Sequence, residues 1–471
     1  MPKEWSTFGV DLLLEIDPTT ARRTGLEHAL RDSIRSGRLA PRTRLPSSRT
    51  LATELGLARG TVTAAYDQLV AEGYLISRRG SGTSVAAIVG RQRDLATPKE
   101  PSAVLRLDLL PGSPDVSTFP TEAWLRSTRR ALSAAPAEVY GYGDPRGRIE
   151  LRTALADYLA RTRGVLAPPD RLVITSGYVQ ALALLSNALL QTGRSVIAME
   201  DPGLDFHRDV VRRSGPQVVA FPVDGRGARA ELLSTSPYAT TGAVVVTPAH
   251  QYPTGVTLHP DRRHALVAWA RERRGVVIED DYDGEFRYDR QPVGAVQGMA
   301  PEHVVYVGSA SKTLGPALRL AWMVLPPPLV EPVVEAKRHA DVHTESLGQL
   351  TLADLITTHA YDRHIRSARL DYRRRRDLLL ERLRAQAPAV NVRGVPAGLQ
   401  TLVDLPPHGP DERSVIDRAA AQGLALSGLD GLWHASGAHP QGIVVGFATP
   451  PGHLYRAAID TLASVLSHRT D

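Results

Sequence analysis

Residues 303–322 read HVVYVGSASKTLGPALRLAW, and this stretch decides the fold of most of the chain. It opens with a short run rich in valine, which ends in a cluster of small and polar residues. Four earlier stretches follow the same scheme: RLVITSG at 171–177, SVIAMEDPG at 195–203, AVVVTPAH at 243–250 and GVVIEDDYDG at 275–284. Helical patterns separate these runs. Short apolar runs that alternate with helices predict a buried, mostly parallel sheet.

The polar residues that end these runs predict a ligand site. In an open α/β sheet the site lies outside the carboxyl ends of the strands, and each polar cluster falls there. The TSGY segment at 175–178 stands between a strand and a helix, where backbone N–H groups form a cup for phosphate. Lys312 can form a Schiff base with an aldehyde, and the acidic segment at 279–286 can pair with a pyridinium nitrogen. Together these groups predict pyridoxal 5′-phosphate as the cofactor.

With these motifs, residues 106–471 resemble the fold-type-I aminotransferases. The resemblance implies that Lys312 forms the Schiff base, that Asp280 bonds the pyridine nitrogen and that Tyr282 bonds the phenolic oxygen. Gln251 and Tyr252 stand where these enzymes place an asparagine near the same oxygen. Further residues are expected to hold the cofactor phosphate: Ser176, Gly177, Tyr178, Ser309 and Arg319 from the same chain, and Tyr142 from the partner subunit of a homodimer. Tyr178 is expected to contribute its backbone N–H.

Two departures from the aminotransferase pattern bear on activity. The position where the family usually places an aromatic residue over the pyridine ring holds Leu204, with Phe206 two positions later. The stretch before the last core strand, at 428–448, contains no arginine to bind a substrate carboxylate. His434 and His439 lie in that stretch as possible replacements. A standard α-amino acid substrate is therefore in doubt.

Residues 87–105 contain two prolines, mixed charges and no sustained hydrophobic period, so we expect a flexible linker. It divides the chain into an N-terminal domain at 19–86 and the large domain at 106–471. Three short helical patterns fit the N-terminal domain, ending at Gly37, Gly56 and Gly73. A strand at 74–76, a basic glycine-bearing tip and a returning strand follow. This order predicts a winged helix-turn-helix.

The N-terminal stretch GRLAPRTRLPSSRTLATELGLARGTVTAAYDQLVAEGYLISRRGSGTSV, at 37–85, resembles the winged-helix domain of GntR-family regulators. Double-stranded DNA is the expected partner. Residues of three kinds are expected to contact it: Arg59, Thr61 and Thr63 at the start of the third helix, the cations Arg49, Arg78 and Arg79, and Gly80 and Gly82, which let the wing approach the duplex.

The distribution of charge supports a nucleic-acid partner for this domain alone. The whole chain of 471 residues has a net charge of +6. Residues 19–93 contain 13 arginines and five acidic residues, a net charge of +8, so the remainder is nearly neutral. An arginine-rich solvated surface would give the same count, and charge alone does not decide between the two interpretations.

Composition excludes several other classes. Hydrophobic residues make up 42% of the chain and charged residues 23%, which is ordinary for a globular protein. Cysteine is absent, which excludes disulfides and cysteine-ligated metals, and we expect no metal site. The longest apolar stretch, around 179–190, is too short to span a bilayer. Acidic residues in the first 18 positions do not suit a secretory signal. We expect a cytoplasmic protein without membrane contact.

Taken together, the two domains resemble a MocR-type regulator over most of the chain. The resemblance implies a transcriptional regulator that binds DNA through the first domain and senses pyridoxal phosphate, or an amine or amino-acid adduct of it, through the second. Genes of vitamin B6 or of amino-acid and amine metabolism are the expected targets. The alternative is a catalytically active aminotransferase with an incidental DNA-binding domain. A DNA-binding protein with a non-functional second domain conflicts with the complete Lys312–Asp280 set.

Overall fold

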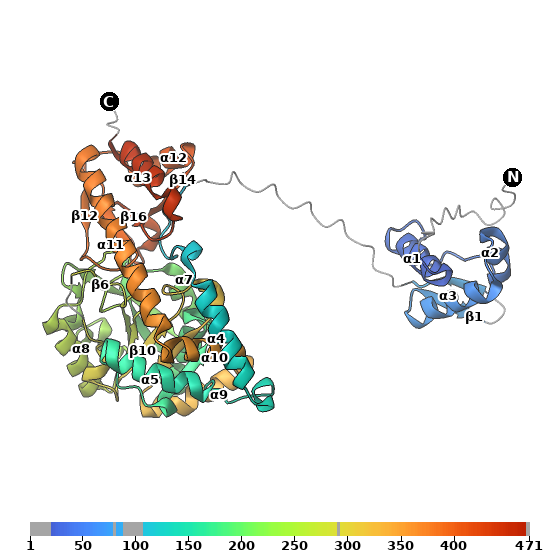
Figure 1. Ribbon diagram of the computed structural model, residues 1–471, viewed down its shortest axis with the longest axis horizontal. Helices are drawn as coiled ribbons and strands as arrows, with labels where there is room; N and C mark the ends of the chain where they lie inside the picture. Colours follow the sequence, from blue (N-terminus) through green and yellow to red (C-terminus); the bar gives the residue numbers. More distant parts are fainter. Residues whose placement is uncertain (1–19, 79–81, 88–106, 290–292, 468–471) are drawn as a thin grey trace. The chain divides into compact units, whose positions relative to one another are not determined.

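The computed structural model describes residues 20–78, 82–87, 107–289 and 293–467, and it divides into two compact units, Met1–Ser102 and Ala103–Asp471 (Figure 1). We call them the head and the body and describe each by itself. The predicted linker falls almost entirely outside the described residues. Among the described residues, no helix has the length and apolar character that crossing a membrane requires.

The head has three helices and a two-stranded wing, as the sequence predicts. The elements are α1 (Arg22–Arg35), α2 (Ser48–Leu55), α3 (Arg59–Ala71), β1 (Leu75–Arg78) and β2 (Gly82–Val85). Helix α2 begins where the Ser47 side chain accepts a hydrogen bond from the Thr50 backbone N–H, and it ends at Gly56 in the left-handed conformation. Strands β1 and β2 pair antiparallel, with Leu75 opposite Val85.

One apolar cluster holds the head together. Leu26 and Leu30 of α1 pack against Val62 and Leu69 of α3, and all four side chains are fully buried. Tyr66 is also buried, and its hydroxyl donates a hydrogen bond to the Pro46 carbonyl oxygen at 3.0 Å. This bond ties α3 to the turn that precedes α2, so the helix-turn-helix has a fixed geometry.

The body contains an eight-stranded sheet with a parallel centre. Five neighbouring strands run parallel, and an antiparallel strand separates them from β4. The strand order is β4 (Leu172–Thr175), β11 (Ala321–Val324), β10 (Val304–Ser309), β9 (Val276–Asp280), β8 (Ala243–Val246), β5 (Val196–Asp201), β6 (Gln217–Asp224) and β7 (Gly227–Ala228). The predicted α/β fold class is confirmed.

Helices cover both faces of this sheet. One face packs against α6 (Tyr178–Gln191), α7 (Asp205–Arg213) and α9 (Pro327–Asp341). The other packs against α5 (Ile149–Arg163), α8 (Pro260–Arg273) and α10 (Ser346–Thr357), and α4 (Thr121–Ala134) lies on α10. Because both faces are covered, the central strands are buried along their whole length.

The long helix α11 (Ala360–Gln386) leads from this layer to a smaller C-terminal part (Figure 1). That part contains a four-stranded antiparallel sheet, a short two-stranded pair and two helices. The elements are β12 (Asn391–Arg393), β13 (Gln400–Asp404), β16 (Gly442–Gly446) and β15 (Ser427–Gly428), then β14 (Leu424–Ala425) paired with β3 (Leu107–Asp108), and α12 (Glu412–Ala421) and α13 (Gly452–Ser467).

A buried ion pair fixes the end of β9. Arg163, at the end of α5, donates to Asp281 through Nε at 2.7 Å and Nη2 at 2.9 Å. The Tyr306 hydroxyl donates to the same carboxylate at 2.7 Å. Both members of the pair are almost fully buried. Gly284 packs so closely against them that a side chain there would collide with Asp281.

We therefore predict that Asp281→Asn lowers the free energy of unfolding of the body by about 3–5 kcal/mol, because it leaves the buried Arg163 guanidinium without a counter-charge. Glu302→Gln is the matched control, since it breaks the more exposed Arg171–Glu302 pair and costs less than about 1 kcal/mol. Urea unfolding followed by circular dichroism gives both values. Equal losses in the two variants would contradict a supporting role for the buried pair.

Candidate functional site

A cavity of about 350 Å³ opens at the carboxyl ends of the central strands of the body. Asp280 ends β9 and pairs with Val307, Ser309 ends β10, and Thr175 at the end of β4 lies in register with Ser309 through Ala321. Seven of the residues predicted for the cofactor site line the cavity: Tyr178, Tyr252, Asp280, Tyr282, Ser309, Lys312 and Arg319. Residues as far apart in the chain as Tyr178 and Arg319 are thus brought to one place by the sheet.

Lys312 is the single lysine among the residues that line this cavity, in a chain with four lysines. Its ammonium group donates a hydrogen bond to the Gly112 carbonyl oxygen. Burial lowers the pKa of Lys312, while Asp280 and Asp283 act in the opposite direction. A lysine with a lowered pKa is a better nucleophile toward a carbonyl group.

Asp280 is a buried carboxyl group on the cavity wall. Burial raises its pKa to about 8, against the smaller effects of the nearby Tyr178 hydroxyl group and of the Lys312 charge. A carboxyl group with this pKa lacks a sufficient cationic partner. A pyridinium N–H placed in the cavity would supply one and would favour the carboxylate. Asp280 therefore fits the nitrogen end of pyridoxal phosphate.

Ser176 and Gly177 contact Arg319, which lines the cavity. The Arg319 guanidinium donates to the Ser176 carbonyl oxygen and lies directly over Gly177. Gly177 precedes α6 with φ of 105°, and a Cβ there would lie 2.5 Å from Arg319 Nη2. An exposed guanidinium beside a helix N-terminus is suited to a phosphate group.

Tyr282 lies in a network of buried polar groups. Its hydroxyl accepts a hydrogen bond from Gln400 Nε2 at 2.7 Å and lies 3.2 Å from His250 Nδ1. His250 Nδ1 also lies 2.8 Å from Asp283 Oδ2. Burial, followed by the charge of Asp283, holds the pKa of Tyr282 well above its usual value. The Tyr282 hydroxyl group therefore remains protonated.

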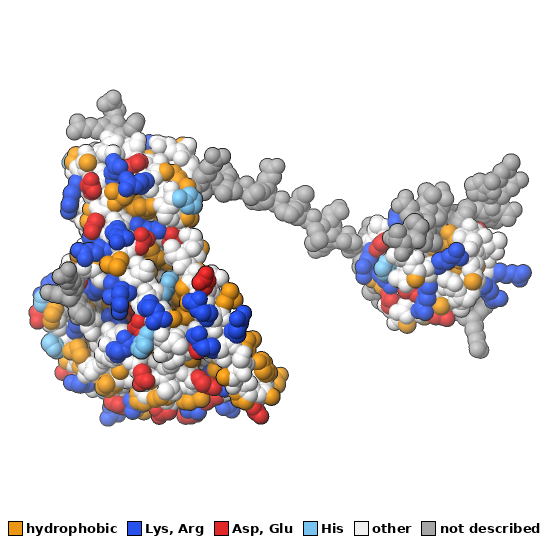
Figure 2. Space-filling model, viewed as in Figure 1, with side chains coloured by type: hydrophobic (Ala, Val, Ile, Leu, Met, Phe, Trp, Pro, Cys, Tyr) orange, Lys and Arg blue, Asp and Glu red, His pale blue; other side chains and the backbone are white. Residues whose placement is uncertain are grey.

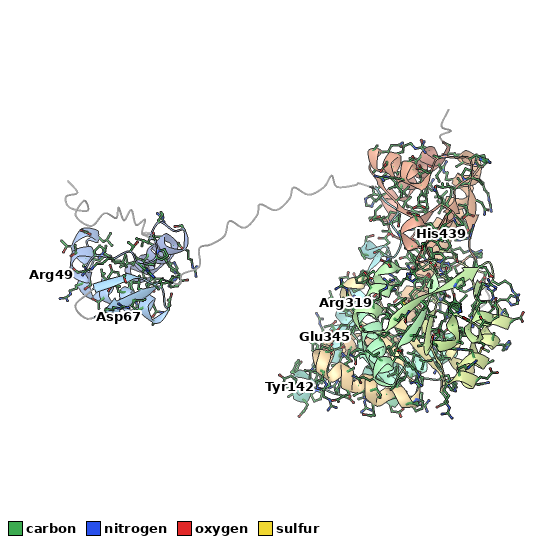
Figure 3. The ribbon with its side chains drawn as sticks, turned by 180° about the vertical axis from the view of Figure 1, so that it is seen from behind. Arg49, Asp67, Tyr142, Arg319, Glu345 and His439 are labelled. Carbon is green, nitrogen blue, oxygen red and sulfur yellow. The ribbon has the colours of Figure 1, made fainter. Side chains whose placement is uncertain are left out.

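Four predicted residues are not among those that line the cavity: Ser176 and Gly177, described above, and Gln251 and Tyr142. Gln251 is buried beneath the site, where its Nε2 donates to the Pro202 carbonyl oxygen at 2.9 Å and its Oε1 accepts from Thr254. The Gln251 side chain thus shapes the loop after β8. Tyr142 is 91% exposed, and Figure 3 shows it at the edge of the body, well apart from Arg319. A contact of Tyr142 with a partner subunit remains a prediction.

The ring that faces the cavity from α7 belongs to His207, which the sequence analysis missed. Leu204 lines the cavity, whereas the Phe206 side chain is mostly exposed and does not. His207 lies almost one helical turn after Leu204, and its ring is 4.8 Å from that of Tyr178. Burial and, to a lesser degree, Lys312 lower the pKa of His207 to about 4, so its ring is neutral at physiological pH.

The cations at the cavity already have other partners. Arg208 Nη2 donates to the carbonyl oxygens of Leu432, at 2.9 Å, and Glu200, at 3.2 Å, and the side chain is 1% exposed. Neither His434 nor His439 lines the cavity: His434 Nδ1 lies 3.1 Å from Arg212, and His439 stacks on Trp433. Arg208 and Arg319 are the arginines among the described residues that line this cavity, and the buried Nη1 of Arg208 has no hydrogen-bond partner.

The head presents a separate candidate site. Arg49, Arg59 and Thr63 are exposed on α2 and α3, and Thr61 is half-buried. Figure 3 shows Arg49 at the outer edge of the head, and basic side chains are visible on its surface in Figure 2. Arg78 is exposed at the end of β1 and Gly82 begins β2, whereas Arg79 and Gly80 lie outside the described residues. Arg44, which the sequence analysis did not select, lies against Gly82.

Comparison with known families matches both parts of the chain. Residues 23–85 match the family of bacterial regulatory proteins of the gntR type. Residues 109–427 match the family of class I and II aminotransferases. The two matches correspond to the head and to most of the body.

Individual relatives match the chain across both the head and the body. The HTH-type pyridoxine biosynthesis transcriptional regulator PdxR of Corynebacterium glutamicum is 31% identical, over 98% of each chain. The probable rhizopine catabolism regulatory protein MocR of Rhizobium meliloti is 32% identical, over 96% of this chain and 95% of that one. Among solved structures, a Pyrococcus horikoshii kynurenine aminotransferase in complex with PMP is 26% identical over 78% of this chain and 91% of its own, with a TM-score of 0.69.

The close approach of Gly177 and Arg319 gives a test of the phosphate end. Gly177→Ala should weaken pyridoxal phosphate binding by roughly 10- to 100-fold, because the methyl group displaces a guanidinium that makes a charge-assisted hydrogen bond. Gly315→Ala is the control, since its backbone is extended and no atom lies within 4 Å of an added Cβ. Equilibrium titration followed by absorbance measures both, and equal affinities would contradict this position for the phosphate.

Proposed function

The chain belongs to the MocR-type regulators of the GntR family, which join a helix-turn-helix head to an aminotransferase-like body, and from this premise we propose that pyridoxal phosphate bound in the body controls DNA binding by the head. The effector is pyridoxal phosphate itself or an adduct that it forms with an amine. We propose DNA control regions as the partner of the head.

The presence of Lys312 and Asp280 in one cavity supports this proposal most strongly. The cavity has a nucleophilic amine with a lowered pKa, a buried carboxyl group whose pKa is raised to about 8, and the Arg319 guanidinium. These groups complement an aldehyde, a pyridine nitrogen and a phosphate in turn. When bound, pyridoxal phosphate supplies an electrophilic carbonyl to Lys312. Asp280 would hold the ring nitrogen, Tyr282 would donate to the phenolic oxygen, and Arg319 with Gly177 would hold the phosphate.

The absence of an arginine from residues 428–448 favours pyridoxal phosphate over an amino acid as the signal. Arg208 lines the cavity, but its Nη2 is engaged with backbone carbonyl oxygens and its side chain is 1% exposed. The relative from Corynebacterium glutamicum is a regulator of pyridoxine biosynthesis. We therefore propose genes of vitamin B6 metabolism as the targets. An amine without a carboxylate is the competing effector.

We also propose a homodimer in which Tyr142 reaches the partner's phosphate site. The body exposes large apolar side chains between residues 116 and 149, including Leu125 at 60% and Tyr142 at 91%. Exposed apolar side chains of this size often belong to an interface. Two heads on one dimer would contact two half-sites on DNA.

Catalysis of amino transfer is the second candidate function, favoured by the complete Lys312, Asp280 and Tyr282 set and by the likeness to solved aminotransferases. Amino transfer and regulation by a bound cofactor place different requirements on the cavity. Turnover needs a fixed cation for the substrate carboxylate, whereas cofactor binding does not.

The covalent attachment provides the most direct test of the cofactor site. Borohydride reduction of the protein with pyridoxal phosphate should fix the label on Lys312, as read by peptide mass spectrometry. Lys312→Ala should abolish the label and retain the circular dichroism spectrum. Lys337→Arg is the control, since Lys337 is buried against Asp341 outside the cavity and the charge is kept. A label that persists in Lys312→Ala would place the attachment elsewhere.

For the head, we predict that Arg49, Arg59, Arg78 and Arg79 contact DNA. Each phosphate contact removed by substitution to alanine should reduce the salt dependence of log K by about 0.9 per unit of log[salt]. Arg59→Ala should also relax base preference if its side chain reaches a base edge. Arg338→Ala on α9 removes the same charge from the body and should leave the slope unchanged. An unchanged slope after all four substitutions would contradict this surface.

Turnover should be weak even where cofactor binding is strong. A carboxylate buried without a partner costs about 3–5 kcal/mol, so transfer from common α-amino acids should be roughly 10²–10³-fold slower than in an enzyme with the arginine. The test mixes the cofactor-loaded protein with excess amino acid and follows the visible absorption of the bound cofactor. Complete loss of that absorption within seconds would favour the aminotransferase.

A further inference from the structure

The surroundings of the Tyr282 hydroxyl group determine where its proton points. Three side chains from different parts of the body meet there: His250 from the loop after β8, Asp283 from the loop after β9, and Gln400 at the start of β13. All three are between 2% and 3% exposed, so the hydrogen bonds that join them are shielded from bulk solvent.

Asp283 fixes the tautomer of His250. A carboxylate only accepts hydrogen bonds, and Asp283 Oδ2 lies 2.8 Å from His250 Nδ1. The Nδ1 atom must therefore carry a proton. The Tyr282 hydroxyl oxygen lies 3.2 Å from the same nitrogen, so it faces a donor and not an acceptor.

The two acceptor positions of the Tyr282 oxygen are thereby occupied. Gln400 Nε2 donates to it at 2.7 Å, and the His250 Nδ1–H is shared between it and Asp283. A phenolic hydroxyl group has one proton of its own to donate. With donors on these sides, that proton points to the remaining side, which is the cavity that Tyr282 lines.

Close packing holds this arrangement in place. Gly398 lies directly over the His250–Asp283 pair, and an added Cβ would overlap the imidazole ring. Gly398 is itself fixed by its N–H, which donates to the Phe286 carbonyl oxygen at 2.7 Å, and by its own carbonyl oxygen, which accepts from Tyr288 at 2.5 Å. The loop before β13 and the loop after β9 thus form one rigid wall.

We propose that His250, Asp283 and Gln400 are positioning residues, which aim the Tyr282 proton at the phenolic oxygen of bound pyridoxal phosphate and thereby set the charge state of the cofactor. The inference rests on the proposed function, since it needs the cofactor in this cavity. A hydrogen bond that Tyr282 donates to the phenolic oxygen stabilises the ionised form of that oxygen. The proton shared between the phenolic oxygen and the Lys312 nitrogen is therefore lost at a lower pH.

Other charged and titratable groups face the same region and contribute a constant background. They come from each element that packs around the cavity: Tyr178 at the start of α6, Asp280 beside Tyr282, Tyr252 after β8, Glu200 at the end of β5, His207 and Arg208 on α7, Lys312 after β10, and Arg319 before β11. None of these groups is changed in the variants below. Differences in titration midpoint between variants therefore report only on the hydrogen bonds among Tyr282, His250, Asp283 and Gln400.

The experiment is a pH titration of the visible absorption of the cofactor-loaded protein. Tyr282→Phe should raise the midpoint pH of the absorbance change. His250→Leu and Gln400→Met should each raise that midpoint by about 0.5–1 pH unit, since each removes one hydrogen bond that orients the Tyr282 hydroxyl group. His250→Asn should retain the wild-type midpoint, because its amide nitrogen replaces Nδ1 as the donor. His303→Leu, outside the cavity, is the control.

A double-mutant cycle separates positioning from general damage. In the Tyr282→Phe background, His250→Leu and Gln400→Met should cause no further shift, because the group on which they act is gone. Shifts that persist in that background, or single variants with a wild-type midpoint, would overturn the inference. A wild-type protein without cofactor absorption would contradict the proposed function and the inference together, whereas a normal wild-type titration that no variant moves would overturn the inference alone.

Discussion

The buried ion pair of Arg163 and Asp281 is the constraint on which the cofactor site depends. It anchors the chain immediately after β9. Asp280 and Tyr282, on either side of Asp281, both line the cavity, whereas Asp281 does not. The anchored carboxylate of Asp281 therefore holds the backbone from which both neighbours reach the cavity. Loss of the pair would therefore alter the site as well as the stability of the body.

Sequence patterns predicted the parts of the structure that local rules control. The valine-rich runs form the central strands, as predicted. Asp280 ends one of these runs and Lys312 follows another, and both line one cavity because the carboxyl ends of parallel strands share an edge. In the head, Leu26, Val62 and Leu69 occupy the core that their helical spacing predicts. Ser47 caps α2, whereas the sequence allows either Ser47 or Ser48 in that position.

Residues that act through tertiary contacts could not be found in this way. Gln400 reaches Tyr282 from a different sheet, 118 positions along the chain, and no local motif marks it. His207 could have been found by counting one helical turn from Leu204, but Phe206 was the more obvious aromatic residue. Gln251 carries the expected residue type near the site, yet its side chain bonds the Pro202 carbonyl oxygen beneath the cavity wall.

The central claim is that the state of the body controls the head, and DNA binding with and without cofactor tests it most directly. Duplexes selected by the purified chain from random sequence serve as the probe in quantitative footprinting. Pyridoxal phosphate should change the affinity of the wild-type chain about fivefold or more, or change the protected bases, and should leave Lys312→Ala unaffected. Identical affinity and footprints of the wild-type chain with and without cofactor would contradict the account.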